Sequence, residues 1–218
     1  MVKFSVDKNK LDRYSCIILD CDGVIFDSNL LKLEAFKNIF IKYDIKLVDK
    51  FIEYFKNNFG TSRYSLVKIF IEDYLKVEFS EKLYHTLLKD YGKQCIELYN
   101  KANLTNSFIE FLKKNKDKKM YVASGSDELE LNIVFRQRNI SYYFEKVYGS
   151  PSKKKYLVKA ICDKNKGKNV VMIGDAKADY LAAKENKIDF IFMSDYSVSD
   201  EMKNDNRLIS IKNFGDLI

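Results

Sequence analysis

The sequence predicts an α/β protein: a parallel sheet with helices on both faces and a helical segment inserted after the first strand. After residue 104, short apolar runs alternate with segments of helical spacing, which is typical of strand–helix–strand units. From residue 28 to 104, apolar residues recur every three or four positions, as in amphipathic helices. With 218 residues, the chain is long enough for a large core and a second, small domain.

The first strand is expected at residues 15–20, where Cys16-Ile17-Ile18-Leu19 is a continuous apolar run, as in strands buried on both faces. The helical segment holds 14 of the 31 aromatic residues, so we expect a small bundle packed by aromatic side chains. A helix is then expected from Thr105, its capping residue, to about Asn115. Further strands are expected at 119–124, 145–148, 169–173 and 188–193, and further helices at 126–138, 152–165 and 177–186.

Two acids, Asp20 and Asp22, stand one residue apart directly after the first strand. Ligands of open α/β sheets bind just beyond the carboxyl ends of the strands. Two carboxylates at such a place are costly to desolvate without a cation or a proton, which indicates a functional site. The plainer interpretation of the same residues is a strand that ends in an Asp-Gly turn.

A later strand ends in the same way, since the run 170–173 is followed by Gly174 and Asp175, with Asp179 one helical turn further on. These two acids can face one pocket. Two strand ends with paired acids indicate a shared hard cation, and Mg²⁺ accepts carboxylates, phosphate oxygens and water. Asp179 alone is also explained as an acid that favours a helix N-terminus.

Ser124, Gly125 and Ser126 follow a third strand and precede a helix, which is a pattern typical of anion sites. The hydroxyl donates and the glycine lets the backbone approach. In the alternative interpretation, Ser124 or Ser126 only caps the helix.

Pro151, the one proline of the chain, is expected at the first position of a helix, which places Lys154 one turn further on. Helical side chains lean towards the N-terminus, so Lys154 can reach back to the end of the sheet. Lys153 and Lys155 stay open for the same role, and in another interpretation all three lysines are solvated surface residues.

These four motifs, in this order, resemble those of the haloacid dehalogenase superfamily. The matching positions, in chain order, are Asp20-Cys21-Asp22-Gly23-Val24, then Ser124, Lys154, and Gly174-Asp175 with Asp179. The resemblance, closest to phosphoglycolate phosphatases and β-phosphoglucomutase-like members, implies a Rossmann-like catalytic core of residues 1–26 and 105–218. A helical cap of residues 27–104 would cover it.

The resemblance also implies magnesium-dependent hydrolysis of a phosphate monoester. Asp20 would form an aspartyl-phosphate, and Asp22 would act as general acid and then general base. Mg²⁺ would be held by Asp20, Asp175, the backbone carbonyl of Asp22 and, through water, Asp179. The residues expected to contact the phosphate are Ser124, Gly125, Ser126 and Lys154.

Two alternatives stay open: a phosphomutase, which keeps both acids, and a non-enzymatic phosphate-binding protein of the same fold. The acid at position 22 argues against cleavage of carbon–halogen bonds, since a halide leaves without a proton. Arg63 lies in the glycine-containing break 58–64 of the helical segment, where it is either a substrate-binding residue or a solvated turn residue. Phosphates of sugars, polyols and amino alcohols, and phosphoglycolate, all stay open as substrates.

The net charge is +7, but basic and acidic residues alternate along the chain, so we expect no nucleic-acid partner. A single histidine, His85, argues against histidine-rich metal centres and Ser-His-Asp hydrolases. The four cysteines show no metal-ligand spacing and are expected to be reduced thiols. With no cleavable signal and no 18-residue apolar run, we expect a cytoplasmic protein without a membrane anchor.

Overall fold

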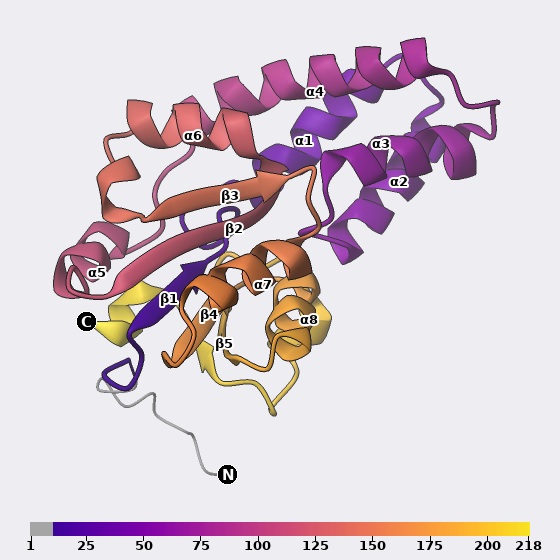
Figure 1. The fold of residues 1–218 in the computed structure, drawn as a ribbon. Helices are drawn as coiled ribbons and strands as arrows, with labels where there is room; N and C mark the ends of the chain where they lie inside the picture. The colour runs from indigo at the N-terminus through magenta and orange to yellow at the C-terminus, as the bar shows by residue number, and fades with distance from the viewer. Residues whose placement is uncertain (1–10) are drawn as a thin grey trace.

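The computed structural model describes residues 11–218 and contains one six-stranded sheet in which all paired strands are parallel. The strand order is β3-β2-β1-β4-β5-β6 (Figure 1). The bounds are β1 (Cys16–Leu19), β2 (Lys119–Asp127), β3 (Lys146–Ser150), β4 (Val170–Gly174), β5 (Asp189–Met193) and β6 (Ser210–Ile211). The predicted parallel α/β sheet is confirmed; β6, a strand of two residues near the C-terminus, was not expected.

Helices cover both faces of the sheet and divide its side chains between two cores. In β1, Ile17 and Leu19 pack on the side of α5 (Phe108–Lys114) and α6 (Glu128–Gln137). The alternate residues Cys16 and Ile18 pack on the side of α7 (Lys154–Lys164) and α8 (Lys177–Glu185). Side chains alternate across a strand, so covering both faces requires the continuous apolar run seen in the sequence. The short α9 (Asp200–Lys203) and a 3₁₀ helix (Phe214–Leu217) lie near the C-terminus.

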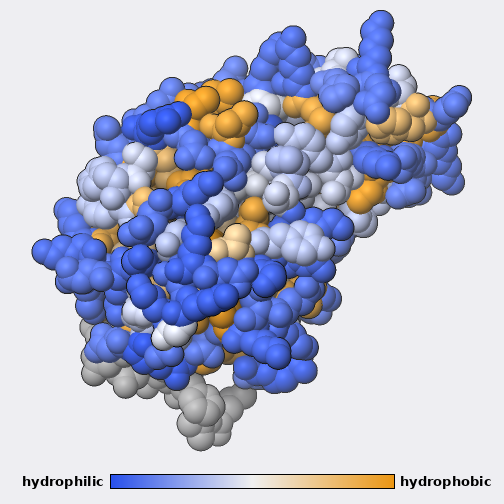
Figure 2. Space-filling view, in the orientation of Figure 1, coloured by the Kyte–Doolittle hydropathy of each residue, from blue (hydrophilic) through white to orange (hydrophobic). Residues whose placement is uncertain are grey.

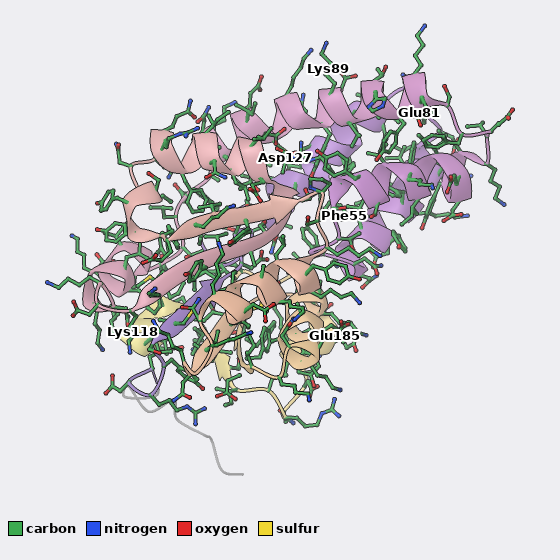
Figure 3. All side chains as sticks on the ribbon, in the orientation of Figure 1. Phe55, Glu81, Lys89, Lys118, Asp127 and Glu185 are labelled. Atoms are coloured by element: carbon green, nitrogen blue, oxygen red, sulfur yellow. The ribbon has the colours of Figure 1, made fainter. Side chains whose placement is uncertain are left out.

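The segment between β1 and β2 is helical and extends away from the sheet (Figure 1). It comprises α1 (Asn29–Phe40), α2 (Ile45–Asn57), α3 (Arg63–Ile69), the π-helical turn η1 (Phe70–Leu75) and α4 (Glu81–Lys101). Aromatic rings pack its interior: Phe36 stacks on Tyr91 with ring centroids 3.8 Å apart, and Phe40 stacks on Phe70 at 3.6 Å. Glu81, at the start of α4, lies far from the sheet (Figure 3).

The chain enters and leaves this helical segment through two stretches that are hydrogen-bonded to each other. The amide of Asp27 donates to the carbonyl of Asn103 (2.9 Å), and that of Thr105 donates to Ile25 (3.0 Å). These two hydrogen bonds join the start of the expected cap, 27–104, to its end. The division into cap and core stays a prediction, and residues 1–10 of the expected core lie outside the described residues.

Two expectations about helix starts are wrong, and so is the alternative interpretation of Ser124 and Ser126 as helix caps. Thr105 does not cap a helix. Its hydroxyl donates to the carbonyl of Val24, where the chain leaves β1 for the inserted helices, and α5 begins only at Phe108. Neither Ser124 nor Ser126 caps α6, because β2 continues to Asp127 and the Asp127 carboxylate accepts from the amides of Leu129 and Glu130. Pro151 does not begin a helix either. It follows Ser150 through a cis peptide bond, and α7 starts three residues later.

Hydrophilic residues cover most of the face drawn in Figure 2, with apolar residues in small groups. His85 is exposed and lies 3.2 Å from Glu81, one turn earlier on α4. The four cysteines are free thiols. Within residues 11–218, no helix is both long enough and apolar enough to cross a membrane.

Candidate active site

The acids predicted from the two strand ends meet at one edge of the sheet. Asp20 and Asp22 follow β1, and Asp175 follows β4, which is the direct neighbour of β1. Asp179 lies in the first turn of α8, and its carboxylate accepts from the amide of Ala176 (3.0 Å). All four side chains are buried. The arrangement follows from the parallel sheet, in which the carboxyl ends of adjacent strands share an edge.

Three of these acids form a cluster that fits a metal ion. Asp20, Asp175 and Asp179 each offer one carboxylate oxygen, and these oxygens lie within 4.8 Å of one another. Asn29, the first residue of α1, donates from Nδ2 to Asp175 Oδ2 (2.6 Å). Asp20 Oδ1 is buried and has no hydrogen-bond partner among the described residues. A cluster of buried carboxylate oxygens is the donor chemistry that Mg²⁺ prefers.

Lys154 is the buried cation of this cluster. Its Nζ lies 2.9 Å from Asp20 Oδ1, off the line of a hydrogen bond, and it also forms an ion pair with Asp179. Lys154 is the first residue of α7, so it reaches the cluster from the start of that helix rather than from one turn further on. Of its neighbours, Lys153 is exposed and Lys155 pairs with Glu185 (3.2 Å).

The charges of the cluster are unbalanced. Burial, and then the charge of Asp179, raise the pKa of Asp20 to about 7, against the opposing effect of Lys154. Burial and the charges of Asp179 and Asp20 raise the pKa of Asp175 well above its usual value. Burial would lower the pKa of Lys154, but Asp179 and Asp20 outweigh it and raise that pKa. One ammonium therefore does not neutralise the three carboxylates, and a bound divalent cation would.

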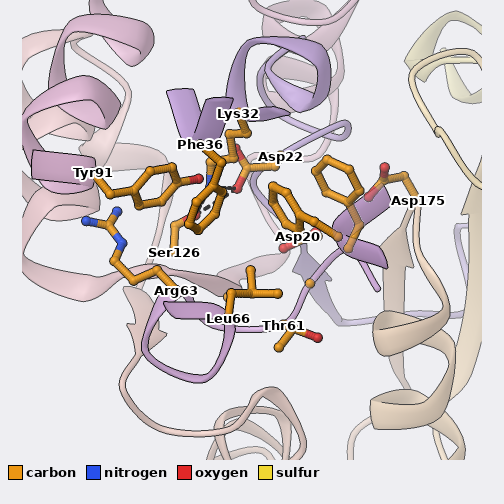
Figure 4. A pocket seen from close by; sticks show the side chains of 14 residues that line it. Asp20, Asp22, Lys32, Phe36, Thr61, Arg63, Leu66, Tyr91, Ser126 and Asp175 are labelled. Atoms are coloured by element: carbon orange, nitrogen blue, oxygen red, sulfur yellow. Dashed lines mark hydrogen bonds and ion pairs between the residues drawn. The ribbon is translucent and has the colours of Figure 1, made fainter. Parts of the chain in front are cut away.

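Asp22 lies outside this cluster and is surrounded by hydrogen-bond donors (Figure 4). Lys32 of α1 donates from Nζ to Asp22 Oδ2 (2.6 Å), and Ser126 donates to the same oxygen (2.8 Å). Ser28 and Tyr99 donate to Oδ1 at 2.6 Å and 2.8 Å. Burial would raise the pKa of Asp22, but the Lys32 charge and these hydrogen bonds outweigh it and lower the pKa. The structure thus holds Asp22 as a carboxylate.

The predicted anion site lies beside these acids. Ser124 is fully buried, and its Oγ accepts from the amide of Ser126 (3.1 Å), which leaves its own proton free to donate. Gly125 and Ser126 line the cavity in front of Asp20. A Cβ at Gly125 would lie 2.5 Å from the carbonyl oxygen of Gly60, so glycine allows the inserted loop to approach this strand end.

With this geometry established, comparison with known proteins identifies the family. The sequence profile described as haloacid dehalogenase-like hydrolase matches residues 17–193. The chain belongs to this family. Among curated proteins, no match is found.

Solved structures share the fold of this haloacid dehalogenase-like hydrolase at low sequence identity. One, described as a predicted phosphatase from Clostridium acetobutylicum, is 19% identical with a TM-score of 0.73, covering 94% of this chain and 96% of its own. A predicted phosphoglycolate phosphatase from Haemophilus somnus is 15% identical with a TM-score of 0.73 and the same coverage. A hydrolase from Bacillus subtilis, described as bound to magnesium, is 14% identical with a TM-score of 0.67, covering 94% and 97%.

Arg63 of the hydrolase is not a solvated turn residue. It is buried, and its two terminal nitrogens donate to the two carboxylate oxygens of Glu130 on α6 (2.8 and 2.6 Å). Its Cζ lies 4.9 Å from the centroid of the Tyr91 ring. Nearby, Tyr64 donates to Asp127 (2.7 Å), which lies where the sheet meets the inserted helices (Figure 3). Residues of α3 therefore attach the inserted helices of the hydrolase to its sheet.

The sequence motifs did not reveal Asn29, Lys32, Tyr99 or Glu130. Asn29 follows the first acidic motif closely in the sequence, and Lys32 lies one helical turn after Ser28, so proximity to that motif was a usable signal for both. Tyr99 and Glu130 have no such signal. They reach the site only because α4 packs against α1 and α3 within the inserted segment and against α6 outside it.

Proposed function

We propose that this chain is a magnesium-dependent phosphomonoesterase that acts on a small phosphorylated metabolite through an aspartyl-phosphate on Asp20. The observation that carries the proposal is the position of Asp20: a buried carboxylate at a strand end, paired with Lys154 (2.9 Å) and clustered with two further acids. A second carboxylate, Asp22, lies two residues away outside the acid cluster. Nucleophile and proton carrier thus have separate surroundings.

Asp20, Asp175, Asp179 and the backbone carbonyl of Asp22 would hold the magnesium ion. When bound, Mg²⁺ would offset the repulsion between the Asp20 carboxylate and a phosphate dianion. The buried, partly unpaired oxygens of the cluster support this assignment.

Side chains and one backbone amide would carry out the nucleophilic attack, the binding of the phosphate oxygens and the proton transfers. Asp20 attacks phosphorus, while the Ser124 hydroxyl, the Gly125 amide and the Lys154 ammonium face the phosphate oxygens, with Ser126 close by. The negative charge of an arriving phosphate favours protonation of Asp22, which then donates to the leaving alkoxide. In the second step, Asp22 as carboxylate takes a proton from the water that hydrolyses the aspartyl-phosphate. The hydrogen bonds in the structure favour this carboxylate form.

We further propose that the partner of the site is a small molecule rather than nucleic acid, and that the protein acts in the cytoplasm. A helical cap of residues 27–104 would close over the phosphate. The two chain segments that connect it to the core are hydrogen-bonded to each other, Asp27 to Asn103 and Thr105 to Ile25, and this supports a hinge at its border.

Phosphate release tests the proposal. The purified protein should release inorganic phosphate from 4-nitrophenyl phosphate or from a small alkyl phosphate when Mg²⁺ is present. EDTA should abolish the release, and excess Mg²⁺ should restore it. Equal release in excess chelator would refute a magnesium enzyme. Conversion of a sugar phosphate to its isomer without phosphate release would indicate a mutase instead.

A further inference from the structure

The cavity in front of Asp20 has a polar side, formed by the core, and an apolar side, formed by the inserted helices (Figure 4). The empty space between its walls is about 410 Å³, part of which is open to solvent. Side chains of the inserted helices and the loop before α3 form the apolar side: Phe36, Phe55, Phe59, Leu66 and Tyr91. With the phosphate at Asp20 and Gly125, the group that leaves with the alcohol faces this wall.

The two cations on this side of the cavity are already paired within the protein. Lys32 lies 2.6 Å from Asp22, and Arg63 makes two hydrogen bonds to Glu130. While Asp22 is a carboxylate, as in the free protein, an anionic group on an entering substrate would have to separate one of these buried pairs or remain unpaired, and both are unfavourable. A cationic group on the alcohol finds no unpaired carboxylate on this side of the cavity either, because Asp22 is paired with Lys32 and Glu130 with Arg63.

Few polar atoms without a partner face the leaving alcohol. Arg63 Nε is buried and has no hydrogen-bond partner among the described residues, so it offers one donor. The Thr61 and Tyr91 side chains add two hydroxyls among the residues that line the cavity. A sugar or polyol carries more hydroxyls than this wall can satisfy, and each one buried without a partner weakens binding.

We propose that the substrate is the phosphate monoester of a small, uncharged alcohol with a largely apolar body, such as an aromatic or branched-chain alcohol. The inference rests on the proposed phosphatase function and narrows its substrate class. It disfavours phosphoglycolate and the phosphates of amino alcohols, sugars and polyols. The observation that carries the proposal is the side of the cavity formed by the inserted helices, where five apolar side chains lie beside two cations that are each paired with an acid.

A panel of esters of similar size tests the inference on the unmodified protein. Propyl phosphate, phosphoglycolate, phosphoethanolamine and glycerol 3-phosphate differ mainly in the charge and polarity of the leaving alcohol, and benzyl phosphate adds an aromatic body. We expect kcat/KM for propyl and benzyl phosphate to exceed that for the two charged esters by about tenfold or more. Glycerol 3-phosphate should fall between them.

One variant tests the role of the paired charges. Glu130→Gln should leave Arg63 with an unpaired charge facing the cavity. The ratio of kcat/KM for phosphoglycolate to that for propyl phosphate should then rise by about tenfold. Glu128→Gln, on the same helix but away from the cavity, is the matched control and should leave the ratio unchanged. The thermal melt of each variant shows whether it folds, and the panel on the unmodified protein decides the inference if Glu130→Gln does not.

The outcomes separate this inference from the function on which it rests. Phosphate release that favours phosphoglycolate, phosphoethanolamine or glycerol 3-phosphate over the apolar esters would overturn the inference and leave the phosphatase proposal intact. Release from none of the esters, nor from 4-nitrophenyl phosphate, would overturn both.

Discussion

The Nζ of Lys32, in the first inserted helix, lies 2.6 Å from the carboxylate of Asp22, two residues beyond Asp20 in the sequence. Both side chains are buried, and Lys32 also donates to Ser126 at the end of β2. The inserted helices therefore supply the cation that holds the second acid in place. The site is complete only when these helices lie against the sheet.

Removal of Lys32 should cost stability, because it leaves Asp22 as a buried, unpaired charge. Lys32→Ala is expected to lower the free energy of unfolding by about 3–5 kcal/mol. Urea unfolding in the presence of Mg²⁺ measures the loss. Lys37→Ala is the matched control: its partner Asp49 lies 3.6 Å away and both are about half exposed, so a loss of about 1 kcal/mol or less is expected. Equal losses in the two variants would show that the Lys32 pair is not a buried, stabilising contact.

Asn29 should position a metal ligand. Its side-chain amide donates to Asp175 (2.6 Å) and to the carbonyl of Tyr196 (2.9 Å), which fixes the carboxylate facing the cluster. Asn29→Ala is expected to weaken Mg²⁺ binding by about 10- to 100-fold, the usual effect of losing such an outer contact. Calorimetric titration of the protein with Mg²⁺ measures this without turnover. Asn38→Ala, on the exposed side of the same helix, should bind Mg²⁺ normally; an unchanged affinity in Asn29→Ala would remove the assigned role.

The acid cluster predicts a pH-dependent stability of the metal-free protein. Because burial and neighbouring carboxylates raise the pKa of Asp20 to about 7 and that of Asp175 well above normal, these groups favour the folded state while they are protonated. Their contribution is lost as pH rises through the folded pKa values. In EDTA, the melting temperature should therefore fall as pH rises from the ordinary carboxyl pKa of 3.8 to the folded pKa of about 7, and change little above that.

Two comparisons check this explanation of the pH effect. Mg²⁺ should restore the melting temperature at the higher pH, because it compensates the ionised carboxylates. Asp20→Asn should reduce the pH dependence of the metal-free protein, since it removes one of the titrating groups. A melting temperature in EDTA that is constant or rises with pH would contradict the charge imbalance of the cluster.

The sequence was most informative where function and local structure coincide. An apolar run that ends in acids marks both a strand and its carboxyl end, so Asp20, Asp22 and Asp175 were recognisable without a structure. The parallel order of the strands then brings them together. Lys154 lies against Asp20 as expected, but it reaches that position from the first residue of α7, because Pro151 precedes the helix instead of beginning it.

The partners of these residues depend on packing over long sequence separations. Lys32 and Tyr99 reach Asp22 from opposite ends of the inserted segment, and Glu130 pairs with Arg63 across 67 positions. Nothing local distinguishes a buried lysine or arginine from a solvated one, and this is why Arg63 was open between two interpretations. Thr105 was misassigned as a helix cap for the same reason, since its partner Val24 lies 81 positions earlier in the sequence.

One measurement tests most directly whether Asp20 is the nucleophile that we propose for a magnesium-dependent phosphatase. Phosphate release from 4-nitrophenyl phosphate is compared between the unmodified protein, Asp20→Asn and Asp27→Asn at saturating Mg²⁺, with folding checked by thermal melts. Asp27 is an exposed acid close by in the sequence and serves as the matched control. We predict that Asp20→Asn loses all measurable turnover while Asp27→Asn keeps normal activity. Turnover near that of the unmodified protein in folded Asp20→Asn would contradict the account.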